Sequence, residues 1–331
     1  MTRKRRVGVI GSIVWDVIYG RDSRSLPVEE WGGITYALGG LDAALADDWE
    51  IVPIIKVGDD LAAGATHFLS TLKHLAPDAR PIAVPYPNNR VELRYYSDER
   101  RSEIMHGGVP AWTWAGLKPV LDAAKLDALY INFLSGWELD LETTTLIRQH
   151  FAGPIYCDLH MLAWAVQPNG LRTLRPIPNV REWCGCFDVL QVNEDEMRML
   201  APDSLALAAT ALHAGVRCLV VTLSKRGAVY FAAADFERLD AEPGAKRRPF
   251  ESIAADVRPM RTAIVPAEHV IDGGDPTGCG DVWGATYFSR LLAGDKFGDA
   301  ILAAHRAAAR NVGHRGASGL SDYLRGTISL T

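Results

Sequence analysis

The chain has 331 residues, 48% of them hydrophobic and 23% charged, and its 35 basic and 40 acidic side chains give a net charge of −5. This balance excludes a disordered or fibrous protein, because it supplies enough apolar side chains for a large core. The slight acidic surplus argues against nucleic-acid binding, which normally goes with a basic surface. The five cysteines, an odd and sparse set, predict reduced thiols in a cytoplasmic protein rather than a disulfide framework.

The first residues look like a signal peptide, since a basic stretch at residues 3–6 precedes an apolar one at residues 7–15. However, Asp16 interrupts the apolar stretch, and Ala37 is the first alanine that could contribute to a cleavage site. We therefore predict a buried first strand here. No apolar run approaches the ~18 residues needed to span a bilayer, so we expect no membrane interaction.

Short apolar runs alternate with helix-like segments along the chain. Runs rich in β-branched residues predict strands at residues 7–10, 51–57, 128–133, 155–158, 187–192 and 218–223. Helical periodicity predicts helices at residues 61–75, 141–150, 194–200 and 204–214. Such alternation is typical of a parallel sheet covered by helices on both faces, so we predict an α/β fold in a single domain, residues 1–331.

One region breaks this pattern. Residues 90–96 alternate between apolar and polar side chains, and residues 102–105 can pair back across residues 97–100. This predicts an antiparallel hairpin in a small accessory sheet laid against the main body. The pattern suits a flap that closes over a ligand as well as a plain surface hairpin.

The most informative segment is Gly-Cys-Gly at residues 278–280, followed by Asp281 and a predicted helix at residues 282–292. Glycines at a helix N-terminus let backbone N–H groups converge on an anion. Asp281 would then accept a proton from a hydroxyl that attacks a bound phosphate. The alternative is a simple helix cap with Asp281 in the first turn. The same helix N-terminus is expected to lower the pKa of Cys279.

Two familiar phosphate-binding motifs do not fit this segment. A Walker loop requires a lysine that is missing here, and a dinucleotide fingerprint requires a small residue where Trp283 stands. Residues 275–281 instead resemble the C-terminal signature D-T-x-G-A-G-D of the ribokinase/PfkB-type carbohydrate kinase family. Five further segments resemble motifs of that family in the same order: residues 11–16, Gly32-Gly33, residues 57–60, residues 193–196 and residues 222–227.

The resemblance implies a ribokinase-like three-layer α/β/α sandwich with a small β-sheet lid built from about residues 16–36 and 90–110. It implies ATP- and Mg²⁺-dependent phosphotransfer to a hydroxyl of a sugar or sugar-like substrate. A nucleoside kinase of the same fold, or a non-catalytic sugar- or nucleotide-binding homologue, are the alternatives. Lids of this family often pair between subunits, so the resemblance also allows a homodimer through the lid.

The resemblance also assigns a role to each motif. Asp281 would be the catalytic base, and the N–H groups of Gly278, Cys279 and Gly280 would form the anion hole. The other implied roles are substrate binding by Asp16, Gly32 and Gly33; nucleotide binding by Thr222, Ser224, Gly227 and His305; Mg²⁺ binding, through water, by Asn193 and Glu196; and a monovalent cation such as K⁺ beside Asp275 and the turn at residues 316–318.

The chain departs from the family pattern around the predicted substrate. Val14 and Ala37 stand where sugar kinases of the family commonly carry asparagine, and Ser224 replaces a glycine of the nucleotide loop. A ribose-specific site is therefore not expected. Aromatic residues enrich the presumed pocket instead: Trp15, Tyr36, Trp112 and Trp114.

Overall fold

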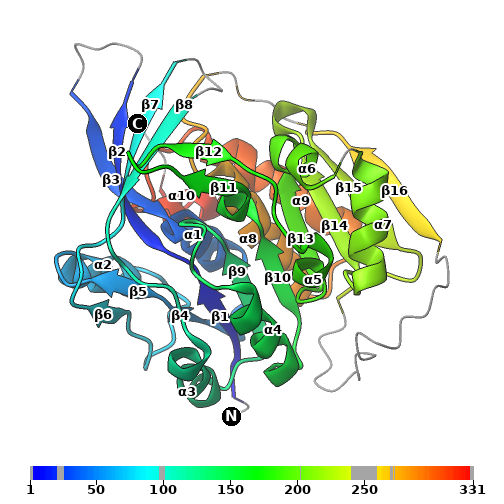
Figure 1. Ribbon diagram of the computed structural model, residues 1–331, viewed down its shortest axis with the longest axis horizontal. Coiled ribbons are helices and arrows are strands. Elements are labelled where there is room, and N and C mark those ends of the chain that lie inside the picture. The colour runs from blue at the N-terminus through cyan, green and yellow to red at the C-terminus, as the bar shows by residue number, and fades with distance from the viewer. Residues whose placement is uncertain are drawn as a thin grey trace.

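The computed structural model describes residues 3–20, 26–96, 101–201, 203–239, 259–268, 271 and 273–328. Its centre is an eight-stranded sheet in the order β16-β15-β14-β13-β10-β9-β1-β4 (Figure 1). Six strands pair in parallel: β1 (Arg5–Ile10), β4 (Trp49–Ile54), β9 (Ala128–Asn132), β10 (Ile155–Asp158), β13 (Val189–Asn193) and β14 (Cys218–Thr222). The last two, β15 (Ala228–Ala233) and β16 (Met260–Val265), extend the sheet in antiparallel fashion.

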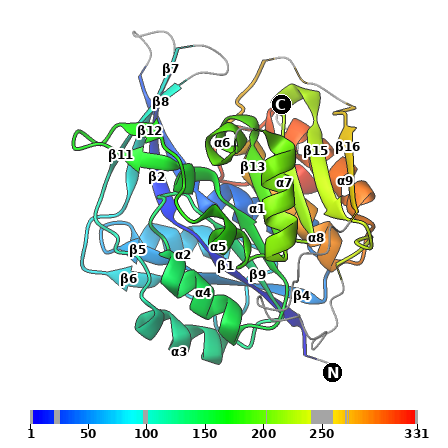
Figure 2. The same cartoon turned by 45° about the vertical axis from the view of Figure 1, so that its right-hand side comes forward.

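Helices cover both faces of this sheet (Figures 1 and 2). They enclose two hydrophobic cores. Successive strand residues alternate between the two cores, as Tyr130 and Ile131 do on β9. One face is covered by α1 (Ile34–Ala44), α2 (Ala62–Ser70), α8 (Cys279–Leu292), α9 (Phe297–Asn311) and α10 (Leu320–Arg325). The other is covered by α3 (Trp114–Ala124), α4 (Leu141–His150), α5 (Val180–Cys184), α6 (Glu194–Leu200) and α7 (Ser204–Ala214). Across the described ranges, we find no helix whose length and apolar composition would let it cross a membrane.

The predicted α/β fold is confirmed, with three differences in detail. The antiparallel pair β15–β16 was not predicted. The predicted strand at residues 51–57 divides into β4 and a short β5 (Lys56–Gly58), which pairs with β6 (Ile82–Val84). The predicted helix at residues 61–75 is too long, because α2 ends at Ser70 and Leu75 forms a bridge with Ile51 at the sheet edge.

A second, four-stranded sheet lies beside the main body, at the upper left in Figures 1 and 2. Its order is β3-β2-β7-β8, from β2 (Ile13–Tyr19), β3 (Val28–Gly33), β7 (Arg90–Tyr95) and β8 (Arg101–His106). The predicted hairpin is confirmed as β7–β8, while residues 97–100 at its tip lie outside the described residues. The inner face buries Val14, Ile18 and Val91 in a small apolar cluster of its own, against which Trp137 packs from outside the sheet. A further sheet consists of the two antiparallel strands β11 (Trp164–Val166) and β12 (Arg172–Leu174).

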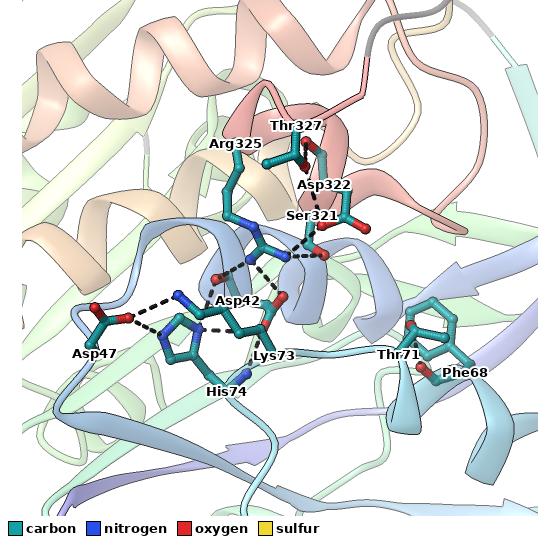
Figure 3. A network of polar contacts seen from close by, with 10 residues as sticks. All are labelled: Asp42, Asp47, Phe68, Thr71, Lys73, His74, Ser321, Asp322, Arg325 and Thr327. Carbon is teal, nitrogen blue, oxygen red and sulfur yellow. Dashed lines mark hydrogen bonds and ion pairs between the residues drawn. The ribbon is translucent and has the colours of Figure 1, made fainter.

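A buried ion pair ties α10 to α1 (Figure 3). The Asp42 carboxylate is fully buried and accepts hydrogen bonds from Arg325 Nη1 at 2.8 Å and from the backbone N–H of His74 at 2.7 Å. Burial alone would raise the pKa of Asp42, but the hydrogen bonds from His74 and Arg325 outweigh it and lower the pKa to about 2. The ion pair therefore holds helices from opposite ends of the chain together.

Candidate active site

Helix α8 begins at the carboxyl edge of the sheet with the predicted anion site. Gly278 has a φ of 75°, and a Cβ added there would lie 2.1 Å from the ring of Tyr36, so only glycine fits. The N–H of Cys279 donates to the carbonyl oxygen of Pro276 at 3.2 Å, and the N–H of Gly280, one residue on, has no acceptor within the helix. Because α8 has 14 residues, its dipole favours negative charge at this end.

The thiol of Cys279 does not behave as predicted. It contacts the carbonyl oxygen of Ala308 at 3.5 Å and accepts a hydrogen bond from Asn311 Nδ2 at 3.3 Å. Burial raises the pKa of Cys279 to about 11, and the hydrogen bond from Asn311 opposes this only in part. The expectation of a lowered pKa was wrong, because desolvation of the thiolate outweighs the helix dipole.

Side chains from three parallel strands hold the start of α8 in place. Asn132, the last residue of β9, is fully buried and donates from Nδ2 to Asp281 Oδ1 at 2.7 Å. Gln191 on β13 donates from Nε2 to the carbonyl oxygen of Gly280 at 3.2 Å and to Asp158 Oδ2, at the end of β10, at 2.9 Å. These contacts fix the Asp281 carboxylate at the edge where parallel α/β sheets bind ligands.

A charged cluster lies next to this arrangement. Glu196 accepts hydrogen bonds from the backbone N–H and Nδ2 of Asn193, at 2.8 and 2.6 Å, and from His160 Nδ1 at 2.8 Å. Burial opposes protonation of His160, but the hydrogen bond to Glu196 and the charges of Glu196, Asp158 and Asp281 raise its pKa to about 9. Burial raises the pKa of Asp158 well above its ordinary value, although the charge of His160 opposes this shift. The carboxylates of Glu196 and Asp281 raise the pKa further.

This cluster fits Mg²⁺ bound through water better than direct ligation. Asn193 uses its whole side-chain amide in a capping box with Glu196, and the Glu196 carboxylate already accepts three hydrogen bonds. Among the residues that the structure describes, no three acidic, histidine or cysteine side chains form a direct ligand set. Three carboxylates that influence one another suit a hard cation that keeps its waters: Asp158, Glu196 and Asp281.

The predicted nucleotide-binding loop joins β14 to β15. Thr222 ends β14 next to Asn193 of β13, its register partner. Ser224 has a φ of 53°, a left-handed conformation that favours the glycine of the family pattern. Gly227 has a φ of 98°, and a Cβ there would lie 2.1 Å from the carbonyl oxygen of Val265, so the turn depends on glycine.

His305 lies on α9 with both ring nitrogens occupied. Its Nδ1 accepts a hydrogen bond from Trp283 Nε1 at 3.0 Å, and its Nε2 lies 3.0 Å from the carbonyl oxygen of Val265. Burial lowers the pKa of His305, in agreement with a neutral ring. The structure thus gives His305 a bridging role between α8, α9 and β16, and an adenine could meet only the face of its ring.

The predicted substrate-binding residues lie where the small sheet meets α1. A Cβ added at Gly32 would lie 1.9 Å from Asp16 Oδ2, so the Asp16 carboxylate rests on the backbone of Gly32. Gly33 caps α1 with a φ of 63°. Asp275 accepts a hydrogen bond from the N–H of Thr277 at 2.9 Å. The turn at residues 316–318 reaches the small sheet instead, where Ser318 Oγ donates to Glu30 at 2.8 Å.

Sequence reasoning missed four polar side chains around the start of α8. Three of them lie at or just after the carboxyl end of a strand, and Gln191 lies two residues before the end of β13. The alternation of strands and helices gave the signal that could have found them, since these ends form the ligand-binding edge. They are Asn132, Asp158, His160 and Gln191.

Comparisons with known proteins bear on the family and the fold of the chain. Residues 163–322 match the sequence pattern described as pfkB family carbohydrate kinase. This matched segment lies in a chain with a ribokinase-like fold. The matched segment contains the start of α8, the nucleotide loop and Glu196, whereas Asp16 and the diglycine lie outside it. A search of curated sequences gave no match.

Solved structures resemble the chain over nearly its whole length. A pyrophosphate-dependent kinase in the ribokinase family has a TM-score of 0.70 at 14% identity, covering 96% of this chain and 98% of its own. An E. coli protein in complex with ATP and Mg²⁺ has a TM-score of 0.69 at 17% identity, covering 96% of both chains. A Burkholderia thailandensis nucleoside kinase in complex with inosine has a TM-score of 0.67 at 16% identity, covering 95% and 94%. At these identities the likeness shows the fold alone.

Proposed function

We propose that the protein is a kinase that transfers a phosphoryl group from MgATP to a hydroxyl of a sugar or sugar-like acceptor. The observation that carries the proposal is the pairing of an anion-binding helix N-terminus with the Asp281 carboxylate, which Asn132 Nδ2 holds from 2.7 Å. This pairing lies in the segment that matches the pfkB pattern. A helix cap alone would not need an aspartate fixed by a buried asparagine from another element.

In this proposal, catalysis consists of positioning and electrostatics. The α8 N-terminus binds the transferred phosphoryl through its N–H groups and dipole. With Asn132 donating to Oδ1 of Asp281, the carboxylate is oriented to take the proton of the attacking hydroxyl. Mg²⁺, when bound, neutralises phosphate charge, and Asp158 and Glu196 would hold it through water. Asp16, on the backbone of Gly32, would accept hydrogen bonds from the acceptor hydroxyls.

Two other phosphotransfer assignments have support from structural relatives. The nucleoside kinase with inosine has the same fold, and so has the pyrophosphate-dependent kinase. The acceptor and the phosphoryl donor are therefore both variables of the test. A panel of D-ribose, inosine and myo-inositol should be incubated with MgATP or magnesium pyrophosphate, with and without KCl, and phosphorylated products detected by mass spectrometry.

The decisive variant is Asp281→Asn, which keeps the shape of the side chain but removes the base. We expect turnover to fall by roughly 10²–10⁴-fold while ligand binding changes little. Asp299→Asn is a matched control, because Asp299 is an exposed first-turn aspartate of α9. If both variants keep more than half of the wild-type turnover, Asp281 is only a helix cap and the proposed role is wrong.

A further inference from the structure

Tyr36, whose ring lies against the start of α8, has a buried hydroxyl without a partner among the described residues. Tyr36 is 2% exposed, and its hydroxyl oxygen has no hydrogen-bond partner among the described residues. Its ring packs against Gly278 at the start of α8, while its own residue lies in the first turn of α1. A buried hydroxyl without a partner is costly unless a ligand supplies the hydrogen bond.

Carboxylates of both proposed subsites affect the pKa of Tyr36. Burial raises the pKa of Tyr36 far above its ordinary value, and the carboxylates of Asp16, Asp275, Glu30 and Asp281 add to the effect. The phenol is therefore neutral and can still donate a hydrogen bond. Asp16 belongs to the proposed acceptor side and Asp281 is the proposed base, so the hydroxyl lies within electrostatic reach of both.

A second side chain in the small sheet is equally unpaired. Asn89 is 1% exposed, and neither Oδ1 nor Nδ2 of its amide has a partner within the part of the chain that the structure describes. The amide of its neighbour Asn88, in contrast, has protein partners for both atoms. Oδ1 accepts a hydrogen bond from the N–H of Gly58 at 2.9 Å, and Nδ2 donates to the carbonyl oxygen of Ile13 at 3.2 Å. The Asn88 amide thus stabilises the fold, whereas the Asn89 amide can form hydrogen bonds with a ligand.

The strand register puts Asn89 on the same face of the small sheet as Asp16. Asp16 is the register partner of Val91 on β7, and Asn89 precedes Val91 by two residues, so alternation turns both side chains to one face. The N–H of Trp15 donates to the carbonyl oxygen of Asn89 at 3.0 Å, which fixes the backbone here. A Cβ added at Gly107 would lie 2.7 Å from Asn89 Oδ1, so glycine leaves room for the amide.

We propose that Tyr36 and Asn89 are specificity-determining residues that hydrogen-bond hydroxyls of the acceptor next to Asp16, and that the acceptor is therefore a polyol, either a monosaccharide or a cyclitol. The inference rests on the proposed function and adds to it the chemistry of the acceptor. A phenol and a primary amide each offer a donor and an acceptor, which is what a hydroxyl group requires. Both residues lie outside the segment that matches the pfkB pattern, as Asp16 does.

The test compares Tyr36→Phe and Asn89→Ala with two matched controls. Tyr287→Phe removes a buried hydroxyl that contacts Cys218 Sγ at 3.5 Å, and Asn88→Ala removes an amide that the fold uses. KM for acceptor, KM for MgATP, kcat and Tm are measured for each variant with whichever of D-ribose, myo-inositol and inosine the wild type uses best. If the wild type phosphorylates none of them, binding of the same three compounds is measured by calorimetry.

We expect D-ribose or myo-inositol to be preferred to inosine. Tyr36→Phe and Asn89→Ala should each weaken acceptor binding, seen as KM or Kd, by about 10-fold or more, with KM for MgATP unchanged. Their Tm should not fall, since no protein hydrogen bond is lost, whereas Asn88→Ala should lower Tm. For the wild type, a preference for inosine or no binding of either polyol would overturn the inference. For Tyr36→Phe and Asn89→Ala, an unchanged KM or Kd for the acceptor, or a loss of Tm equal to that of Asn88→Ala, would also overturn it. If the wild type binds a polyol without phosphorylating it, and Tyr36→Phe no longer binds that polyol, this result would refute the kinase proposal but support the present inference.

Discussion

Removal of Arg325 should leave a buried charge in the core, and the structure gives the size of the effect. Asp42 is fully buried, whereas the Arg325 side chain is 19% exposed. A shift in the pKa of Asp42 from 3.8 to about 2 corresponds to about 2.5 kcal/mol of stability at neutral pH. Removal of one partner of a buried ion pair typically costs about 3–5 kcal/mol. Because the hydrogen bonds from His74 persist, we expect a smaller loss than this range, about 2.5–3 kcal/mol.

The variant is Arg325→Met, which keeps an unbranched side chain to pack beside α1. An unfolding entropy of about 2.1 cal/mol/K per residue gives roughly 0.7 kcal/mol/K for this chain, so Tm should fall by about 4 °C at pH 7. The pKa of Asp42 is lowered in the folded state, so its stabilisation is complete above pH 3.8 and is lost as the pH falls toward 2. The difference between variant and wild type should therefore shrink in this acid range.

The assay is urea unfolding of both proteins at pH 7, 5, 4 and 3, with the double variant Asp42→Asn/Arg325→Met as the control. The double variant has no buried charge, so it should be more stable than Arg325→Met alone. Equal stability of the single and double variants at pH 7 would show that an uncompensated carboxylate is not the cause. A difference between Arg325→Met and wild type that persists unchanged to pH 3 would refute the assigned titration.

Three further predictions concern the candidate site. Gly227→Ala should lower the free energy of unfolding by about 2–4 kcal/mol and raise KM for the nucleotide, since the added Cβ would meet the carbonyl oxygen of Val265; urea unfolding and initial rates check both, and an unchanged nucleotide KM would remove this turn from the nucleotide site. Asp16→Ala should weaken acceptor binding by roughly 10–100-fold in calorimetry, from about 1.5–3 kcal/mol for hydrogen bonds to a charged group; equal weakening of nucleotide binding would indicate misfolding instead. If the small sheet is a lid, amide hydrogen exchange in residues 90–95 and 101–106 should slow on acceptor binding, and in residues 275–284 on nucleotide binding; strands already protected without ligand, and unchanged by it, would mark a fixed element.

The sequence predicted those parts of the fold whose signal is local. Helices α4, α6 and α7 begin and end where the pattern placed them, because an aspartate or asparagine caps each of them. The strand pair β15–β16 and the true end of α2 were missed. Their boundaries are set by neighbours in space, such as the bridge between Ile51 and Leu75.

The same contrast holds for the site. The glycine turn and Asp281 could be predicted from adjacent residues, because a helix N-terminus carries its own anion chemistry. Asn132 is 149 residues away from Asp281 along the chain, and no spacing rule connects them. Cys279 shows the limit of local reasoning, since its pKa depends on burial among residues of α9 that adjacency does not reveal.

The Asp42–Arg325 pair also has a consequence for synthesis of the chain. Helix α1 is made early, and its carboxylate must stay hydrated or protonated until residues 320–325 leave the ribosome, since burial of an unpaired charge is costly. The two N-terminal strands β1 and β4 can pair before then, but the face of the sheet that carries α1 cannot close stably. During synthesis of this protein, α1 should therefore dock only after translation of α10. Arrested nascent chains that end before residue 320 should then remain sensitive to protease around α1, although most of the sheet has already been synthesised.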